Sequence, residues 1–537
     1  MPSFSSRSPD TAVCITTTPD ILESSTANWA GRENALLQTK METTERFWRS
    51  ERQIAFAAAY AVLLFVTAAA LWSCVHFGYE PALGIAAIVI GAATLVALRK
   101  WPMTMFAGLL FVGNFKTIPA HGISLSDPTM VLFLLCCGAI AIDFLSRLIN
   151  GYSDWTLGTL LAGQAVRISL FILFVIVLAA SFLYTPTEQY GGVKLSRFLA
   201  FETLAFFGPI LLAKDEKALR PFLLATIVLS LGLLAKQIIG VWHPSQQVLQ
   251  GTGDVTEIGH GMAFATSILI TIYSKLINSR LLMASVLTAL AVGLVTAAAR
   301  TPALALVVTL IIVSFVLKTG SRHLNGKKML LRLSLIAIVA IMAFLWVQNK
   351  PGMRDKLASK EHEVESMLSG STREGGTIAK RMDFYNSALN AFTQHPLTGL
   401  GLGGWSVFYS GQGIPGEGMP KYPHNFLLEV ASEQGLPGLA LLVTLLLSLL
   451  YSSLKMAKSP EFAFLFPVLT FQVLYNAFTG TVEDRALWFW FGMVVAASRI
   501  VRNSQPLHSR AWSMNRQQVP QLAGAGGFYD RKSSRCL

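Results

Sequence analysis

Apolar runs of about 17 to 25 residues, the length that crosses a bilayer as one α-helix, recur along this chain. They extend from about residue 53 to about residue 501, and short polar segments separate them. The composition agrees, because 53% of the residues are hydrophobic and only 14% are charged, unlike an ordinary globular protein. The chain is therefore predicted to fold as an all-α, polytopic transmembrane helical bundle.

The runs predict fourteen spans, with twelve as the alternative count, because the run at 102–115 is short for a bilayer crossing. The predicted spans are residues 53–75, 81–98, 102–115, 129–149, 167–185, 196–213, 220–240, 259–277, 280–298, 301–318, 329–348, 435–454, 461–480 and 486–501. The domain organisation follows: a tail at 1–52, a transmembrane domain at 53–501 and a second tail at 502–537.

Lysine and arginine mark the cytoplasmic side of membrane proteins, and here alternate connections between spans carry most of them. The basic set comprises Arg99, Lys100, Arg147, Lys214, Lys217, Arg220, Lys275, Arg280, Lys318, Arg322, Lys327, Lys328, Arg332, Lys455 and Lys458. Both tails are basic and fall on that same side. The charge pattern therefore predicts cytoplasmic termini and places the connection from about 349 to 434 outside the cytoplasm.

The net charge of +13 is spread over these short connections, so it indicates topology and not a nucleic-acid-binding patch. The five cysteines have no disulfide or metal-ligand spacing, and neither a metal nor another cofactor is predicted. The aromatic cluster at 488–491 is most simply a belt at the membrane interface.

The connection from about 349 to 434 is too long for a simple linker, and long segments of this kind in compact folds are usually functional. Residues 376–394 are predicted to be helical, and a glycine-rich turn follows at 395–404. A second short helix is predicted to begin near Pro423 and His424 and to end at Gly435 and Pro437. Helical spacing puts its polar residues on one arc, namely Asn425, Glu429, Ser432 and Glu433.

Several cations and one imidazole converge on the predicted outer boundary of the membrane. Arg197 and Arg300 lie at outer ends of spans, and Arg381 and His424 lie in the connection from about 349 to 434 on the same side. A guanidinium binds phosphate oxygens through paired, charge-assisted hydrogen bonds, and a histidine can accept a proton from a hydroxyl near neutral pH. This combination fits a lipid-linked phosphate or diphosphate as substrate.

Motifs for nucleotide-sugar chemistry are missing from the sequence. There is no Asp-x-Asp pair to hold a divalent ion and no Gly-x-x-x-x-Gly-Lys-Ser/Thr phosphate loop. The remaining possibility is a glycan donor that is already carried on a lipid.

The resemblance to a known family lies mainly in residues 290–440. The residues that carry it are Ala299-Arg300-Thr301-Pro302-Ala303-Leu304, Arg381 with Asn386-Ser387-Ala388-Leu389, Pro396-Leu397-Thr398-Gly399-Leu400-Gly401-Leu402-Gly403, His424-Asn425-Phe426-Leu427-Leu428-Glu429 and Glu433-Gln434-Gly435-Leu436-Pro437-Gly438. This combination resembles the O-antigen ligase and polymerase family of bacterial membrane glycosyltransferases. The chain departs from the family pattern at Gln250, where an arginine is expected, so Arg197 or Lys194 is left to supply the second cation.

The resemblance implies a metal-independent, inverting enzyme with a GT-C-like helical fold in the bacterial inner membrane. It also implies that the enzyme uses an undecaprenyl-diphosphate-linked glycan at the periplasmic face, so that the connection from about 349 to 434 is periplasmic. His424 is expected to act as base on the acceptor hydroxyl, while Arg300, with Arg197 and Arg381, holds the diphosphate. Asn425, Glu429 and Glu433 are predicted to bind substrate. For the two glutamates, orienting His424 or fixing the loop helix are the alternatives.

The acceptor decides the enzyme's name and stays open. A lipid A core would make the protein an O-antigen ligase, a second lipid-linked glycan a polymerase of O-antigen or exopolysaccharide, and a protein hydroxyl an O-oligosaccharyltransferase. A transporter or flippase of lipid-linked glycans is the alternative from another class. Transporters place binding groups near the bilayer midplane within repeated halves, and the sequence shows no such repeat.

Overall fold

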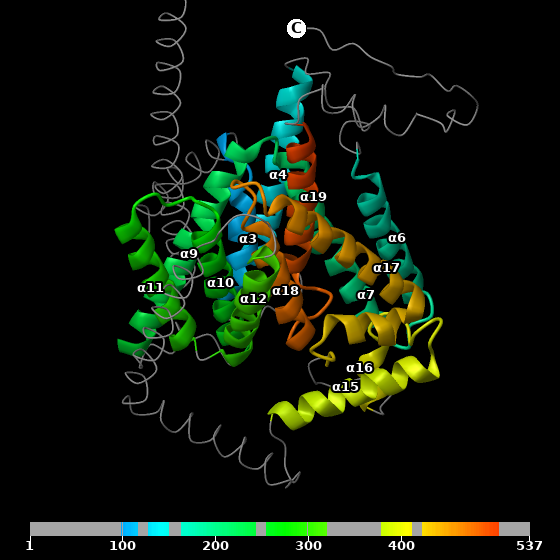
Figure 1. Cartoon of the computed structure of the whole chain (residues 1–537). Helices are drawn as coiled ribbons and strands as arrows, with labels where there is room; N and C mark the ends of the chain where they lie inside the picture. Colours follow the sequence, from blue (N-terminus) through cyan, green and yellow to red (C-terminus); the bar gives the residue numbers. More distant parts are fainter. Residues whose placement is uncertain are drawn as a thin grey trace, which may run out of the picture. The chain divides into compact units, whose positions relative to one another are not determined.

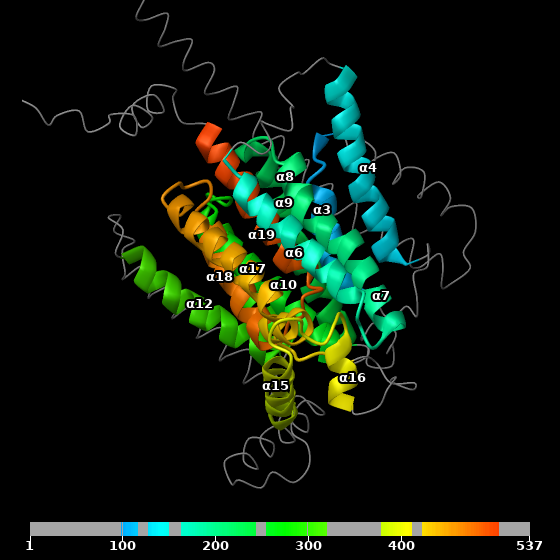
Figure 2. The same cartoon turned by 90° about the vertical axis from the view of Figure 1, so that its right-hand side faces the viewer.

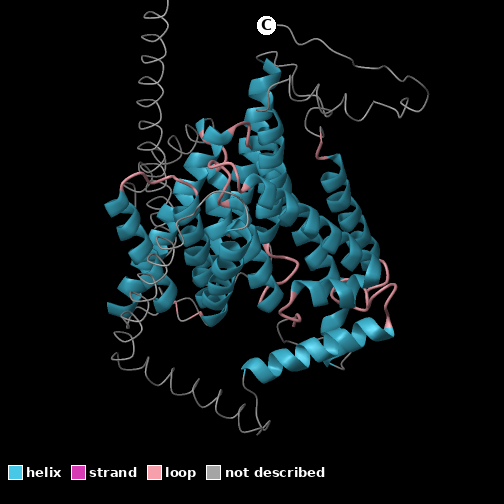
Figure 3. Cartoon of the chain, viewed as in Figure 1, coloured by secondary structure: helices cyan, strands magenta, loops and turns pink. Residues whose placement is uncertain are grey.

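The computed structural model describes residues 98, 100–115, 127–149, 163–242, 254–297, 299–318, 377–410 and 421–503. All of them lie in one of the chain's two compact units, Ala57–Leu537. Within the described residues the regular structure is helical, and no strand occurs there (Figure 1 and Figure 3). The predicted all-α fold is confirmed for this part of the chain.

Fifteen helical elements make up the described residues. In chain order they are α3 (Thr104–Phe115), α4 (Pro128–Ile149), α6 (Ala165–Phe182), α7 (Glu188–Arg197), the π-helical turn η1 (Phe198–Glu202), α8 (Thr203–Leu212), α9 (Glu216–Trp242), α10 (Asp254–Tyr273), α11 (Arg280–Thr296), α12 (Arg300–Lys318), α15 (Thr377–Gln394), α16 (Gly404–Ser410), α17 (Phe426–Met456), α18 (Leu465–Phe478) and α19 (Arg485–Asn503).

Six described segments are long and apolar enough to cross a membrane. They are Pro128–Ser146, Ala165–Phe182, Glu188–Leu212, Glu216–Ile238, Arg300–Leu317 and Phe426–Met456. Helices α3, α11, α18 and the Ile258–Tyr273 part of α10 are apolar but shorter. The spans predicted at 53–75, 81–98 and 329–348 lie outside the described residues, Leu98 excepted, so the count of twelve or fourteen stays a prediction. The predicted tails also lie outside them, except for the end of α19.

Helix α19 is buried on all sides in the bundle, and this corrects the prediction of an interfacial belt at 488–491. The side chains of Trp488, Phe489, Trp490 and Phe491 are at most 2% exposed. Their rings pack against aromatic rings of α6, η1, α9 and α3, as in the contact of Trp488 with Phe198 at 5.2 Å between centroids. Residues 486–497 of α19 are apolar on every face, as is typical of a helix in a protein interior, which explains why these rings do not lie at the membrane surface.

The span predicted at 196–213 begins earlier than expected. Helix α7, η1 and α8 form one continuous helical segment, Glu188–Leu212, with a π-helical turn in its middle. Residues 186–195 were predicted to be a polar connection, but most of them are the first turns of this helix. As a result Lys194 is 1% exposed inside the bundle and not in a loop.

Helix α17 is also longer than the predicted span at 435–454. It starts at Phe426, and the short helix predicted before Gly435 is its first part. The chain bends at Gly435, whose φ of 64° and ψ of −160° are not helical. Figure 2 shows α17 running beside α6 and α18, against which it packs.

The two ends of the bundle differ in chemistry. At one end, Lys214 forms an ion pair with Asp143 at 2.6 Å, Arg499 donates to the carbonyl oxygen of Ala213, and Arg167 donates to Ser452 near the end of α17. At the other end lie the start of α17, the end of α18 and helix α15, which lies across this end of the bundle (Figure 1). Most of the predicted site residues belong to this second end.

Candidate active site

The first turn of α17 is fixed by Asn425. Its side-chain Oδ1 accepts hydrogen bonds from the backbone amides of Leu427 at 3.0 Å and Leu428 at 3.1 Å, and its carbonyl accepts from the amide of Glu429. This is an asparagine N-cap, which satisfies amides that have no partner within the helix. The helix therefore begins at Phe426 and not at Pro423, and the predicted substrate-binding role of Asn425 stays a prediction.

His424 precedes this cap with a φ of 56°, a left-handed conformation that is uncommon outside glycine. Its ring lies between two aromatic rings: Phe384 of α15 stacks on it at 5.8 Å between centroids, and Tyr422 contacts it at 4.3 Å. Nδ1 lies 3.5 Å from the carbonyl oxygen of Thr479, a long contact. A carbonyl only accepts, so this contact requires the proton on Nδ1 and leaves Nε2 with its lone pair.

The surroundings of His424 favour the neutral imidazole. Burial lowers its pKa below the ordinary value of 6.5, and the positive charge of Arg381 acts in the same direction. The Thr479 carbonyl and the Glu429 carboxylate oppose this shift without reversing it. Burial also raises the pKa of the neighbouring Tyr422 to about 12, so its hydroxyl keeps its proton at neutral pH. The site therefore holds an unprotonated base beside a phenol.

Helix α15 brings Arg381 to the start of α12. The Nη1 atom of Arg381 lies 3.5 Å from the hydroxyl of Thr301, the residue after Arg300. Tyr385, one turn further along α15, donates to the carbonyl oxygen of Phe478 at 3.3 Å, close to the Thr479 carbonyl that faces His424. Arg381 thus acts on the charge of His424 and contacts the residue that follows Arg300, which brings α15 close to the starts of α12 and α17.

Arg300 is the first residue of α12, and its side chain is exposed. A helix N-terminus already carries the positive end of the helix dipole, so a cation there is unfavourable unless an anion binds beside it. The first turn of α12 contains no acidic residue. Arg300 and the helix end together form a surface suited to an anion.

Arg197 is placed differently. It is the last residue of α7, its side chain is exposed, and its charge acts on the carboxylate of Glu483. Among the described residues, no hydrogen bond or ion pair joins the Arg197 side chain to His424, Arg300 or Arg381. Its predicted role at the diphosphate stays a prediction.

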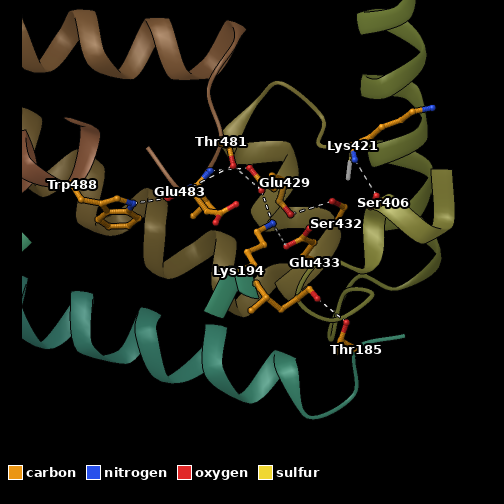
Figure 4. Close-up of polar contacts among 12 residues, drawn as sticks. Thr185, Lys194, Ser406, Lys421, Glu429, Ser432, Glu433, Thr481, Glu483 and Trp488 are labelled. Atoms are coloured by element: carbon orange, nitrogen blue, oxygen red, sulfur yellow. Dashed lines mark hydrogen bonds and ion pairs between the residues drawn. The ribbon is translucent and has the colours of Figure 1, made fainter. Parts of the chain in front are cut away.

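Lys194 lies between the two glutamates of α17, and Figure 4 shows its ammonium group pointing at both of them. Nζ lies 2.5 Å from Oε1 of Glu429 and 2.7 Å from Oε2 of Glu433. All three side chains are at most 3% exposed. Both carboxylates therefore have a cationic partner within the protein, and this partner joins α7 to the first part of α17. The predicted binding of substrate by Glu429 and Glu433 stays a prediction.

This arrangement also separates the two residues considered for the second cation. Lys194 is committed to two carboxylates, whereas the guanidinium of Arg197 is exposed. Sequence reasoning missed the ion pairs because 235 and 239 residues separate the partners. The available signal was the spacing of Glu429 and Glu433 by one helical turn, which places two carboxylates side by side in an apolar segment.

The glycine-rich turn binds α17 where this helix bends. The amides of Leu400 and Gly401 donate to the carbonyls of Ser432 and Glu433 at 2.9 and 3.0 Å, and the amide of Leu436 donates to Pro396 at 2.8 Å. The carbonyl of Glu433 needs a partner outside the helix, because Pro437, four residues later, has no amide hydrogen to donate. The turn therefore supplies hydrogen bonds that a regular helix would make internally.

The end of α6 holds the other side of this turn. The amide of Leu402 donates to the carbonyl of Ser181 at 3.2 Å, and its carbonyl accepts from the Thr185 hydroxyl at 2.7 Å. Tyr184 donates to Thr398 at 2.6 Å. The backbone amides of the predicted glycine-rich turn are therefore largely used in hydrogen bonds within the protein.

Within the described residues, no group of three or more His, Cys, Asp or Glu side chains is arranged to hold a metal ion. The prediction of a metal-independent site stays a prediction.

The comparison with known families bears directly on this end of the molecule. Residues 261–443 match the family model described as O-Antigen ligase. The matched segment contains α12, α15, the glycine-rich turn, His424 and the first part of α17. Among curated proteins, none matches the chain. The resemblance stated from the motifs is therefore confirmed: residues 261–443 form an O-antigen ligase family domain within a multi-pass helical membrane protein.

Proposed function

We propose that this protein transfers a glycan from an undecaprenyl-diphosphate carrier to the hydroxyl of an acceptor sugar. The observation that carries this proposal is the meeting of His424, Arg381 and the Arg300 end of α12 inside the matched domain. A neutral imidazole next to two arginines suits a reaction in which a hydroxyl attacks and a diphosphate leaves.

His424 acts as the general base in this reaction. The unprotonated Nε2 takes the proton of the acceptor hydroxyl while the hydroxyl oxygen attacks the anomeric carbon of the donor glycan. A new glycosidic bond forms, the bond between the anomeric carbon and the phosphate oxygen breaks, and the diphosphate leaves with the electron pair. A base of this kind contributes about 10²- to 10⁴-fold to the rate. One direct displacement of this type inverts the anomeric configuration.

Arg300 and Arg381 bind the diphosphate. Negative charge grows on the leaving phosphate oxygen in the transition state, and cationic donors already placed there lower the barrier. The helix dipole of α12 adds to the same potential. The reaction requires no metal ion in this scheme, because the two guanidinium groups and the helix end supply the positive charge.

The periplasmic position of the site is part of the proposal. It is supported by the basic residues at the opposite end of the bundle, among them Arg167, Lys214 and Arg499, because cytoplasmic ends of membrane helices are enriched in such residues. The acceptor is a lipid A core or a second lipid-linked glycan. Membrane lipids surround the bundle and deliver both substrates.

Reconstituted protein tests the proposal directly. Wild type and the His424→Ala variant are incubated with a lipid-linked glycan and with each acceptor in turn, and new glycosidic bonds are detected by mass spectrometry. We expect product with wild type and a loss of at least about 100-fold with His424→Ala. Movement of glycan between leaflets without a new bond would identify a transporter, and equal turnover by both proteins would refute the base assignment.

A further inference from the structure

The loop between α18 and α19, residues 479–482, connects the base to the buried ion pairs. At its start, the carbonyl of Thr479 faces Nδ1 of His424 at 3.5 Å. At its end, Glu429 accepts hydrogen bonds from the Thr481 hydroxyl at 3.0 Å and from the Val482 amide at 2.8 Å (Figure 4). One carboxylate thus holds the loop whose carbonyl sets the imidazole.

We propose that Glu429, held in place by Lys194, is a positioning residue for His424. It fixes the 479–482 loop so that the Thr479 carbonyl keeps the proton on Nδ1 and directs Nε2 toward the acceptor hydroxyl. The inference rests on the proposed function, because it gives His424 the role of base.

Burial gives this contact its strength. Glu429 is fully buried and Val482 is fully buried, so water does not compete for these hydrogen bonds. Val482 is also held from the other side, since its carbonyl accepts from Nε1 of Trp488 at 2.7 Å. A loop fixed on both sides presents the Thr479 carbonyl in one direction, as a positioning group requires.

Lys194 makes the arrangement possible. A carboxylate buried without a cation loses its charge or disrupts the fold, whereas one paired with an ammonium group stays ionised and accepts strong hydrogen bonds. Glu429 also continues the helix directly from the cap, because its amide donates to the carbonyl of Asn425 at 2.9 Å. It therefore links the segment that carries His424 to the segment that faces it.

Glu433 provides a matched control on the same helix. It is as deeply buried as Glu429, lies one turn away and binds the same Nζ atom, yet among the described residues its side chain has no recorded contact with the 479–482 loop. Replacing either glutamate removes one buried ion pair. Only the replacement of Glu429 changes the support of the loop.

The experiment uses the full-length protein in detergent and compares Glu429→Gln, Thr481→Val and Glu433→Gln with wild type. Thr481→Val keeps the ion pairs and nearly the same shape, so it remains informative if Glu429→Gln does not fold. Reactivity of His424 toward diethyl pyrocarbonate at about pH 7 is followed by mass spectrometry of the peptide that contains it. This readout does not depend on glycan transfer. The groups around His424 that influence its reactivity are Arg381, Glu429, Tyr422 and the Thr479 carbonyl.

We expect Glu429→Gln and Thr481→Val to raise the labelling rate of His424, and Glu433→Gln to leave it as in wild type. In the transfer assay, the first two variants should lose about 2- to 10-fold in kcat at unchanged KM, the value of one hydrogen bond. Wild-type labelling in both Glu429→Gln and Thr481→Val, or equal labelling in the Glu429→Gln and Glu433→Gln variants, would overturn the inference. Absence of transfer by wild type would instead refute the proposed function, while the labelling result would still test the positioning.

Discussion

Two polar clusters lie at the same end of this bundle, and they differ in how completely their charges are paired. Around Lys194, three buried charged groups use their polar atoms on one another and on the 479–482 loop. Around Arg300, Arg381 and His424, the hydrogen bond found for the two arginines among the described residues is the long contact of Arg381 with the Thr301 hydroxyl at 3.5 Å, and Arg300 is exposed. The comparison teaches that one sequence motif contributes to both clusters. Glu429 and Glu433 stabilise the packing of α17 against α7 through Lys194, and His424 faces the substrate in the proposed reaction.

The largest effect is expected in the cluster of Arg300, Arg381 and His424. Replacing His424 by alanine should lower kcat by about 10²- to 10⁴-fold, because the acceptor hydroxyl loses its base. The fold should persist, since the ring is only half-buried and makes no ion pair with the buried Lys194 group. Turnover in reconstituted membranes and thermal unfolding in detergent measure the two quantities, and a variant that loses both together would contradict this division of roles.

The paired cluster should respond in stability. Lys194→Met leaves two buried carboxylates without a cation, and breaking a buried pair in this way costs about 3–5 kcal/mol. The thermal midpoint in detergent should fall steeply. The double variant Lys194→Met with Glu433→Gln should recover part of the loss, because one uncompensated charge is removed. A midpoint like that of wild type in the single variant would show that the triad does not support the fold.

Replacing Arg300 should affect activity and not stability, in contrast to replacing Lys194. Arg300→Ala should lower kcat/KM by about 10- to 100-fold, the value of a charge-assisted hydrogen bond to phosphate, with little change in stability. Arg300→Lys should retain part of the activity, since it keeps the charge but loses the paired geometry. Both are read from initial rates at several donor concentrations, and an unchanged KM and kcat in Arg300→Ala would remove this residue from the site.

Replacing Gly435 tests the contact between the bend in α17 and the glycine-rich turn without changing any charge. Its φ of 64° is unfavourable for alanine, and an added Cβ atom would lie 2.7 Å from the carbonyl carbon of Leu397. Gly435→Ala should therefore cost about 1–3 kcal/mol. Thermal unfolding in detergent measures this loss of stability. Gly113→Ala is the matched control, because a Cβ atom at Gly113 would meet no neighbour within 4 Å.

The smallest effect concerns pH. The pKa of His424 lies below 6.5 in the folded protein, so the base stays neutral and kcat should stay level until the pH falls through that lower value. In the unfolded chain the same histidine binds its proton near 6.5. The unfolded state thus binds more protons between the two values, and this residue should make folding less favourable as the pH falls below 6.5. A pH profile of kcat, and unfolding of wild type compared with His424→Asn, measure both.

Local patterns predicted much of the fold. Apolar length gave helices at 128–149, 165–182 and 300–318 close to the expected bounds, and spacing gave the helix at 377–394. The glycines at 399, 401 and 403 indicated a turn, and each adopts a positive φ. These features depend on neighbouring residues, which is why the sequence alone was enough.

Features that depend on distant segments were missed. The sequence predicts that the rings of Trp488 and Phe489 form a belt at the membrane interface, because it does not show that other helices enclose α19. Lys194 was assigned to a polar connection, since its partners are more than 200 residues away. The N-cap at Asn425 had a visible signal, an asparagine before an apolar run, but Pro423 was a competing start signal.

The contact between the glycine-rich turn and the bend in α17 has an evolutionary consequence. A side chain at Gly399 would meet the backbone of Glu433 at 2.4 Å, and one at Gly435 would meet Leu397 at 2.7 Å, so neither position can change without separating the two segments. The glycine-rich turn and the first part of α17 are thereby tied together. A side chain at either glycine would therefore also disturb the helix start that follows the base at His424.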